Sequence, residues 1–279
     1  MIFRPHRLKT GKILIYFLLF AFLFIPAACT LTDDTVNDGN PAEKDILKVG
    51  ITPDAPPLIY KFKGEITGLE AELARELAQF SGKSLRFIEV KWNEQIPALL
   101  SGKTDIIMSG MTITDLRRVR IAFTKPYLVT GQISLVRRKD LYRFGNGLTD
   151  LMNPTIRIGT VTGTTGDYLV RETVARASSM QFRAPDQAVK ALMDGSIDVF
   201  VYDLPMNLYF GSQNESKGLV PVPVPLSREF LAWGVRTEDK NLLDTANRFI
   251  EKLQQEKQLQ EKIQKWIPFY KNFYNQSQG

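Results

Sequence analysis

Two segments of the sequence, 93 residues apart, follow the same pattern. Residues 98–110 read ALLSGKTDIIMSG, and residues 191–203 read ALMDGSIDVFVYD. Each begins as the end of an amphipathic helix, passes a glycine that can terminate the helix, and continues through an aspartate into an apolar strand. Any strand–helix–strand unit shares part of this pattern, but its repetition favours two similar α/β lobes.

The surrounding chain alternates short apolar strands with amphipathic helices, which is typical of the α/β class. Strands are predicted at 46–51, 84–90, 131–138, 155–161 and 230–236, and helices at 69–82, 93–102, 163–174, 187–195, 204–210 and, as one long polar helix, 239–267. Ligands of open α/β sheets bind beyond the carboxyl ends of the strands. The polar residues that end both repeated segments are therefore expected at a ligand site.

The N-terminal segment has the features of an export signal. Basic residues from Arg4 to Lys12 precede thirteen apolar residues, 13–25, a run that is short for a membrane span and typical of a signal peptide. Residues 1–28 are thus predicted to be a signal peptide, and the polar residues 29–45 a flexible tether. The protein is expected at the extracytoplasmic face of a bacterial membrane.

Cys29 is the only cysteine of the chain and follows two alanines. Its position resembles that of the acylated cysteine of bacterial lipoproteins, which predicts a lipid anchor. Pro26 is a departure, because lipoproteins usually carry leucine there. The alternative is ordinary cleavage after Ala28, which would leave the chain without an anchor.

Composition excludes several kinds of chemistry. Four of the formal +6 charges precede Asp33 within residues 1–28, so 6 − 4 leaves about +2, and no basic stripe indicates nucleic-acid binding. The only histidine, His6, also lies in the signal segment. Without a further histidine or cysteine, the exported chain lacks histidine-dependent triads, cysteine–histidine pairs and zinc sites. No catalytic residue, metal or cofactor is predicted.

Residues 109–120, SGMTITDLRRVR, form one candidate binding segment. Gly110 lets the backbone approach a ligand, and Thr112 or Thr114 can cap a helix that starts near Asp115. The guanidinium of Arg117 can reach the same point and bind a carboxylate through two hydrogen bonds. The alternative is a capped helix with solvent-facing arginines, and that interpretation is kept for Arg118 and Arg120.

A second helix start carries the complementary groups. Thr164 and Thr165 open the helix after residues 155–161, with N–H groups that can face an anion. Asp203 ends its strand, where it either caps the next helix or accepts hydrogen bonds from an ammonium group. Together with Arg117, these residues would pair both charges of a free α-amino acid.

Residues 46–270 resemble the extracytoplasmic amino-acid-binding proteins of polar amino-acid ABC transporters, family 3 of the bacterial solute-binding proteins. The resemblance rests on LKVGITPDAPPLIY, GLEAELARELA, the stretch from Trp92 to Tyr127, and VFVYD. It implies the two-lobed periplasmic-binding-protein fold of type II, in which each lobe is a mixed, mostly parallel sheet flanked by helices. Two hinge strands would join lobe 1, residues 46–131 and 235–279, to lobe 2, residues 132–234.

The resemblance also implies a function. A monomer without cofactor would close around an amino acid and deliver it to an ABC transporter permease. Arg117 and the N–H groups of Thr112 and Thr165 would bind the carboxylate, whereas the Gly110 carbonyl, the Thr112 hydroxyl and Asp203 would bind the ammonium. Trp92 would stack on the ligand side chain, with Ser109 and Met111 nearby.

One segment departs from the family pattern. The loop TPDAPP, residues 52–57, has Thr52 and Ala55 near positions where the family often carries an aromatic or acidic residue. The second wall of the side-chain pocket is therefore open, and Asp54 and Glu70 are acidic candidates to meet a basic side chain.

Two other functions remain as alternatives. Some relatives resemble cyclohexadienyl dehydratases, enzymes that need a general-acid carboxylate in the cleft, and without histidine only Asp or Glu could serve. A ligand-sensing role beside a separate receptor is the third interpretation.

Overall fold

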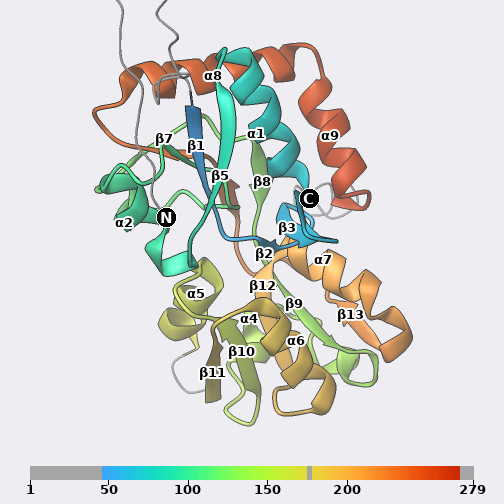
Figure 1. Cartoon of the computed structure of the whole chain (residues 1–279). Helices are drawn as coiled ribbons and strands as arrows, with labels where there is room; N and C mark the ends of the chain where they lie inside the picture. The colour runs from blue at the N-terminus through green and yellow to red at the C-terminus, as the bar shows by residue number, and fades with distance from the viewer. Residues whose placement is uncertain (1–45, 175–177, 271–279) are drawn as a thin grey trace, which may run out of the picture. The chain divides into compact units, whose positions relative to one another are not determined.

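The computed structural model describes residues 46–174 and 178–270 (Figure 1). The predicted signal peptide, the tether and Cys29 lie outside these residues, as do residues 271–279 of the predicted lobe 1. Within the described part of the chain, no helix combines the length and hydrophobicity that a membrane span needs.

The first sheet is mixed and has five strands in the order β5-β1-β6-β15-β7. Its members are β1 (Ile46–Ile51), β5 (Ser84–Glu89), β6 (Ile106–Ile107), β7 (Ala122–Phe123) and β15 (Gly234–Val235). Strand β1 pairs in parallel with β5 and β6, whereas β15 pairs antiparallel with β6 and β7. A strand from late in the chain, β15, thus lies inside the sheet, between β6 and the edge strand β7.

The second sheet is also mixed and has five strands, in the order β11-β10-β12-β9-β13. They are β9 (Gln132–Arg137), β10 (Arg157–Val161), β11 (Ser178–Phe182), β12 (Val199–Asp203) and β13 (Leu219–Pro221). Strand β10 pairs in parallel with β11 and β12, and β9 pairs antiparallel with β12 and β13. The two sheets confirm the predicted α/β class, with one of the repeated segments in each.

Two strands connect the sheets. The chain leaves the first sheet through β8 (Leu128–Thr130) and returns through β14 (Glu229–Leu231), and these strands pair antiparallel. The prediction of a single strand at 230–236 is therefore wrong, because this segment is divided between β14 and β15. Between them lies Trp233, fully buried and stacked on Tyr127 and Phe249. This anchored residue separates the connecting strand from the sheet strand.

Helices pack around both sheets. On the side of the first sheet, α1 (Leu69–Phe80) and α2 (Gln95–Leu100) contact its strands. Helices α8 (Lys240–Gln255) and α9 (Gln258–Trp266) contact each other and α1. Those that contact the second sheet are α5 (Thr165–Thr173), α6 (Pro185–Asp194) and α7 (Leu204–Gln213). Leu69, Leu73 and Leu77 of α1 are fully buried, as their helical spacing predicts.

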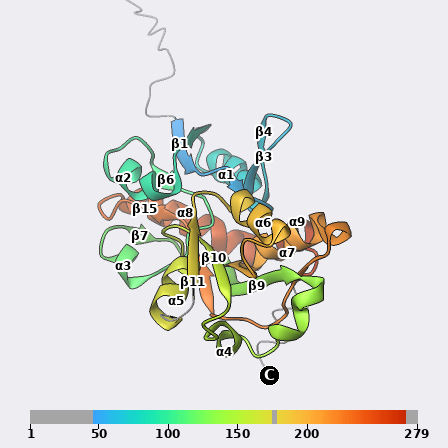
Figure 2. The same cartoon turned by 90° about the horizontal axis from the view of Figure 1, so that it is seen from below.

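Shorter elements complete the described chain. A three-stranded sheet consists of β2 (Asp54–Ala55), β3 (Ile59–Phe62) and β4 (Glu65–Thr67). Short helical segments are α3 (Asp115–Arg118), α4 (Leu148–Leu151) and the 3-10 segments η2 (Trp92–Glu94), η3 (Arg138–Arg143) and η4 (Glu215–Lys217). Helices α3 and α5 lie side by side and line one groove (Figure 2).

The long C-terminal helix predicted at 239–267 is two helices. They meet at Lys257, which has a left-handed backbone with φ 62°. The turn lets α9 pack against α1, where Lys262 Nζ lies 3.0 Å from Glu72 Oε1 and the Trp266 indole N–H donates to Glu72 Oε2 at 2.7 Å. No glycine or proline marks the break, so helical periodicity continues through it.

Candidate functional site

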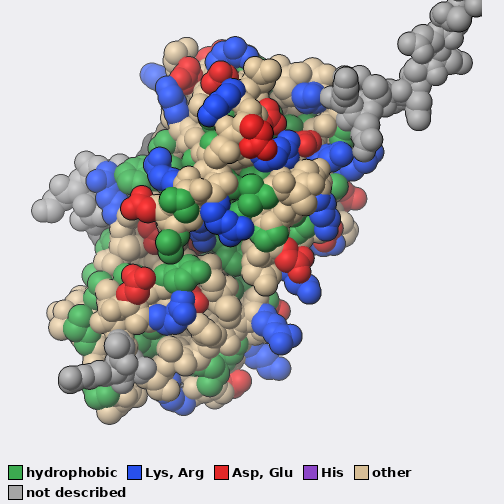
Figure 3. Space-filling model, turned by 90° about the vertical axis from the view of Figure 1, so that its left-hand side faces the viewer, with side chains coloured by type: hydrophobic (Ala, Val, Ile, Leu, Met, Phe, Trp, Pro, Cys, Tyr) green, Lys and Arg blue, Asp and Glu red, His purple; other side chains and the backbone are tan. Residues whose placement is uncertain are grey.

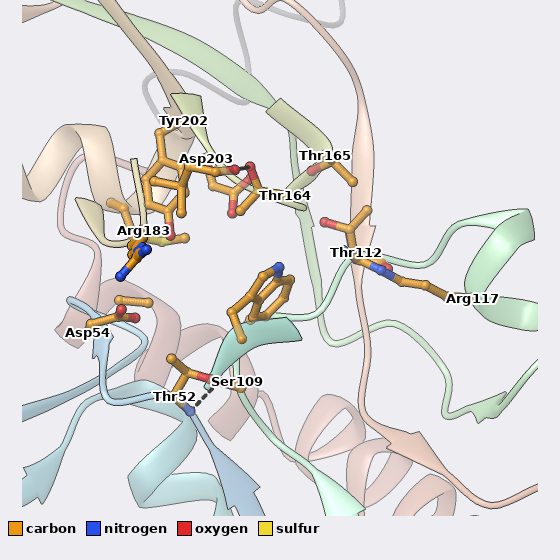
Figure 4. Close-up of a pocket in the computed structure, with 15 residues that line it drawn as sticks. Thr52, Asp54, Ser109, Thr112, Arg117, Thr164, Thr165, Arg183, Tyr202 and Asp203 are labelled. Atoms are coloured by element: carbon orange, nitrogen blue, oxygen red, sulfur yellow. Dashed lines mark hydrogen bonds between the residues drawn. The ribbon is translucent and has the colours of Figure 1, made fainter. Parts of the chain in front are cut away.

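A cavity lies where residues of the two sheets face each other, and a boundary between two parts of a fold is a common place for a small-molecule site. The first-sheet side contributes Thr52, Asp54, Ala55, Trp92, Ser109, Gly110, Thr112 and Arg117. The second-sheet side contributes Val161, Thr164, Thr165, Arg183, Tyr202, Asp203 and Met206. Figure 4 shows Arg117 at one end of the cavity and Asp54 with Arg183 at the other.

The cavity brings together all but one of the residues predicted from the sequence. They are Trp92, Ser109, Gly110, Thr112, Arg117, Thr164, Thr165 and Asp203. Met111 does not line it, because its side chain is buried in an apolar cluster with Leu99, Ile107 and Ile121. Alternation along the chain turns Met111 away from its neighbours Gly110 and Thr112.

Arg117 is directed toward the cavity by the short helix on which it lies. Thr114 caps α3, its hydroxyl accepting the Arg117 backbone N–H at 3.2 Å, as predicted. The Arg117 side chain donates from Nη1 to the Thr112 carbonyl at 2.7 Å and lies over the Trp92 ring, 5.3 Å from its centroid. Arg118 and Arg120, in contrast, are exposed. The remaining donors of Arg117 are available to an anion.

Desolvation lowers the pKa of Arg117, and the charges of Asp203 and Glu229 oppose this shift. The guanidinium therefore remains a cation in a partly water-excluded site. A hydrogen bond from such a group to a carboxylate is stronger than one in water.

Asp203 is the acidic counterpart of Arg117. It precedes α7, but its side chain makes no capping hydrogen bond, so the predicted capping alternative does not apply. Its carboxylate is buried and accepts a hydrogen bond from Gln132 Nε2. Burial and the charge of Glu229 raise the pKa of Asp203, and Gln132 and Arg117 oppose this shift. An ammonium group beside Asp203 would stabilise its ionised form.

The hydroxyls of Thr112 and Thr165 meet at a residue that sequence reasoning missed. Glu229 Oε2 accepts from both hydroxyls, each at 2.8 Å. Gln132, also missed, donates from Nε2 to Thr165 Oγ1 at 3.0 Å. Neither residue belongs to a recognisable sequence motif. Their shared feature is structural, because Gln132 begins β9, which follows the connecting strand β8, and Glu229 begins the connecting strand β14.

One threonine and one serine of the predicted site have local structural roles as well. Thr164 caps α5 by accepting the Asp167 backbone N–H at 3.3 Å. Ser109 Oγ accepts the Thr52 backbone N–H at 2.8 Å, which joins the ends of β1 and β6. These bonds fix the backbone on both sides of the cavity.

Two acidic residues were predicted to meet a basic ligand side chain, and for Glu70 this prediction is wrong. Its side chain is fully buried outside the cavity lining, where it accepts from the Gly110 backbone N–H at 2.5 Å and from the Tyr127 hydroxyl at 2.9 Å. Burial raises the pKa of Glu70 to about 7. Glu70 therefore supports the backbone of the site from behind.

Asp54 does line the cavity. Partial removal from water and the charge of Asp186 raise the pKa of Asp54 to about 6. Arg183 and Tyr202 lie at the same end (Figure 4), and unlike Asp54 these two residues were not predicted from the sequence. The end of the cavity opposite Arg117 is thus lined by the carboxylate of Asp54 and the guanidinium of Arg183, and the charge of Asp186 acts on Asp54 from outside the lining.

Comparison with known proteins places this chain in a family. The bacterial extracellular solute-binding proteins, family 3, match residues 47–269. The chain belongs to this family. A probable histidine-binding protein of Campylobacter jejuni is 33% identical over 195 residues, which cover 69% of this chain and 73% of the relative.

Solved structures agree with the family. A binding component of an ABC transporter from Wolinella succinogenes, complexed with lysine, superimposes with a TM-score of 0.77 at 32% identity and covers 80% of this chain and 96% of its own. An ancestral amino acid-binding protein, a precursor of cyclohexadienyl dehydratase, superimposes with a TM-score of 0.74 at 30% identity over 80% of this chain and 96% of its own. The predicted family and two-lobed fold are confirmed.

Proposed function

We propose that this extracellular solute-binding protein binds a free α-amino acid in the cavity and delivers it to an ABC transporter permease. The observation that carries the proposal is that one cavity is lined by the half-buried cation Arg117 and by the buried carboxylate Asp203. Free amino acids carry one charge of each sign, so both would be paired on burial. The relatives, named as amino-acid-binding proteins, support this ligand class.

Each predicted residue that lines the cavity has a role in the proposal. Arg117, with the N–H groups of Thr112 and Thr165, binds the ligand carboxylate. Asp203 and the Gly110 carbonyl bind the ammonium, and Trp92 covers the side chain. Ser109 and Thr164 shape the backbone on either side.

The ligand side chain points away from Arg117 and ends near Asp54. Asp54 and the nearby Asp186 outnumber Arg183, so a cationic side chain is favoured at this end. The lysine complex and the histidine-binding relative support a basic amino acid.

A calorimetric titration of the purified chain with each of the twenty amino acids tests the proposal. We expect one or a few basic amino acids to bind with micromolar or tighter affinity and to raise the melting temperature by mass action. Absence of binding to every amino acid would refute it.

The division into lobes and the lipid anchor belong to the same proposal. Lobe 1 comprises residues 46–131 and 235–279, lobe 2 comprises residues 132–234, and acylated Cys29 holds the protein at the membrane. We expect Cys29→Ser to move the protein from the membrane to the soluble fraction, whereas Arg118→Ala leaves it in place. Retention of the Cys29→Ser variant in membranes would contradict the anchor.

We propose that the protein is not an enzyme. The structural neighbour linked to cyclohexadienyl dehydratase is described as its amino acid-binding precursor, which supports binding rather than catalysis. Prephenate turnover by the purified chain, lost on Asp203→Ala, would overturn this view.

A further inference from the structure

Glu229, at the start of β14, joins polar groups from both sides of the cavity. Its Oε2 atom accepts the Thr112 and Thr165 hydroxyls, each at 2.8 Å, and its Oε1 atom accepts the Ser227 hydroxyl at 2.8 Å. We infer that Glu229 is a positioning residue for the amino acid, which sets the direction of both threonine hydroxyls and links the two sides of the cleft. This inference rests on the proposed function.

The direction of the hydroxyls follows from the chemistry of the carboxylate. An ionised carboxylate only accepts hydrogen bonds, so both threonine protons point to Glu229. The lone pairs of Thr112 Oγ1 are then left to accept a hydrogen bond from the ligand ammonium. Thr165 Oγ1 accepts from Gln132 Nε2 at 3.0 Å and donates to Glu229, so both partners hold this hydroxyl in place.

The link across the cleft follows from the places of the three residues in the fold. Thr112 follows β6 of the first sheet and forms an isolated bridge with Leu231 of β14. Thr165 is the first residue of α5, which packs on the second sheet. Opening the cleft would separate Thr165 from Thr112, so Glu229 could keep only one of the two hydroxyls. The pair of bonds therefore favours the closed arrangement.

A simpler role for Glu229 is to neutralise Arg117. Its charge does act on both Arg117 and Asp203. If that were its only role, removing the charge would free Arg117 for the ligand carboxylate, and binding would become tighter. The two roles thus predict opposite effects of Glu229→Gln.

Calorimetry on the full chain distinguishes the positioning role of Glu229 from the neutralising role. A glutamine amide offers one acceptor oxygen and adds donors, so it cannot order all three hydroxyls. We expect Glu229→Gln and Thr165→Val each to weaken amino-acid binding roughly ten-fold or more, with a melting temperature close to that of the unmodified chain. Both substitutions break the same hydrogen-bonded group of Glu229 and Thr165, so their effects should not multiply. We expect the affinity of the double variant to be at most about three-fold lower than that of the weaker-binding single variant.

Glu229→Asp keeps the charge but shortens the reach, and is expected to bind as weakly as Glu229→Gln. Glu261→Gln, an exposed carboxylate on α9, is the matched control and should leave binding unchanged. Unchanged or tighter binding by Glu229→Gln, or effects of Glu229→Gln and Thr165→Val that simply multiply, would overturn the inference.

A second readout is independent of ligand. Trp92 contacts the opposite side of the cleft, so its fluorescence, obtained by subtracting the spectrum of Trp92→Phe, reports closure. We expect Glu229→Gln to shift this emission to longer wavelength, and an unchanged spectrum would contradict the link. If the unmodified chain bound no amino acid, the proposed function would fail, whereas this shift would still test Glu229.

Discussion

The Trp92 indole N–H donates a 3.0 Å hydrogen bond to the carbonyl of Gly163, which joins η2 on one side of the cavity to the loop before α5 on the other. The same ring supports the Arg117 guanidinium, whose central carbon lies 5.3 Å from the ring centroid. One side chain thus both orients the proposed carboxylate-binding group and contacts the opposite side of the cleft.

Trp92→Phe should retain the ring and lose the hydrogen bond. We expect amino-acid affinity to fall about five- to ten-fold, the size of one lost neutral hydrogen bond, and Trp92→Ala to lose more because Arg117 is no longer supported. Calorimetric titration measures both effects. Trp266→Phe, whose N–H donates to Glu72 on α1, is the control that should leave affinity unchanged.

Arg117→Ala should reduce affinity roughly 100-fold or more, because charge-assisted hydrogen bonds to the ligand carboxylate are lost. Arg117→Lys should recover only part of this loss, since an ammonium lacks the planar fork of the guanidinium. Titration of both variants beside Arg118→Ala, which alters only an exposed arginine, tests the assignment. Wild-type affinity in Arg117→Ala would mean that another group binds the carboxylate.

Ligand binding should release a proton from Asp203. Burial and the charge of Glu229 raise its pKa well above the ordinary value, and the ligand ammonium would lower it again. Because the ligand prefers ionised Asp203, affinity should decline as the pH falls through this raised pKa. Calorimetry at pH 7 in phosphate and in Tris should give different apparent enthalpies. Asp203→Asn should abolish that difference, and equal enthalpies for the unmodified chain would contradict the prediction.

Asp54→Asn should change ligand preference rather than abolish binding. If a cationic side chain meets Asp54, affinity for basic amino acids should drop about ten-fold, with little change for glutamine. Asp186→Asn is the informative companion, because it removes a charge that acts on Asp54 without lining the cavity. A uniform loss for all amino acids in Asp54→Asn would point to a structural role instead.

Glu70→Gln should alter stability in a pH-dependent way. The folded pKa of Glu70 is raised from 4.5 to about 7, so the folded state binds the extra proton between these values. Stability should therefore fall as the pH rises from about 4.5 to 7, by on the order of 3 kcal/mol from this group. Denaturant unfolding at several pH values should show this slope in the unmodified chain and in the exposed-site control Glu65→Gln, but not in Glu70→Gln.

The distribution of charged side chains on the surface agrees with the small net charge of the chain without its N-terminal segment. On the face in Figure 3, basic and acidic side chains are interspersed. This distribution matches the near balance of charges that follows once the four N-terminal cations are set aside.

Local signals explain which predictions hold. Thr114 caps α3 because a hydroxyl three residues before Arg117 can satisfy its N–H, and this geometry depends only on neighbours in the chain. The α1 core positions follow from helical spacing for the same reason. The break at Lys257 could not be predicted, because its left-handed backbone is stabilised by the packing of α9 on α1 rather than by a glycine.

The sequence by itself determined the α/β class and the two repeated strand ends with their polar residues, and it singled out Arg117 and Asp203 as candidate groups of opposite charge. It did so because periodicity, capping and charge are properties of nearby residues. Only the tertiary structure decided that Met111 turns into an apolar cluster, that Glu70 supports Gly110 from behind, and that Glu229 meets Thr112 and Thr165. The contacts of Glu70 and Glu229 join residues 40 to 117 positions apart, and no local pattern encodes which distant side chains a fold brings together.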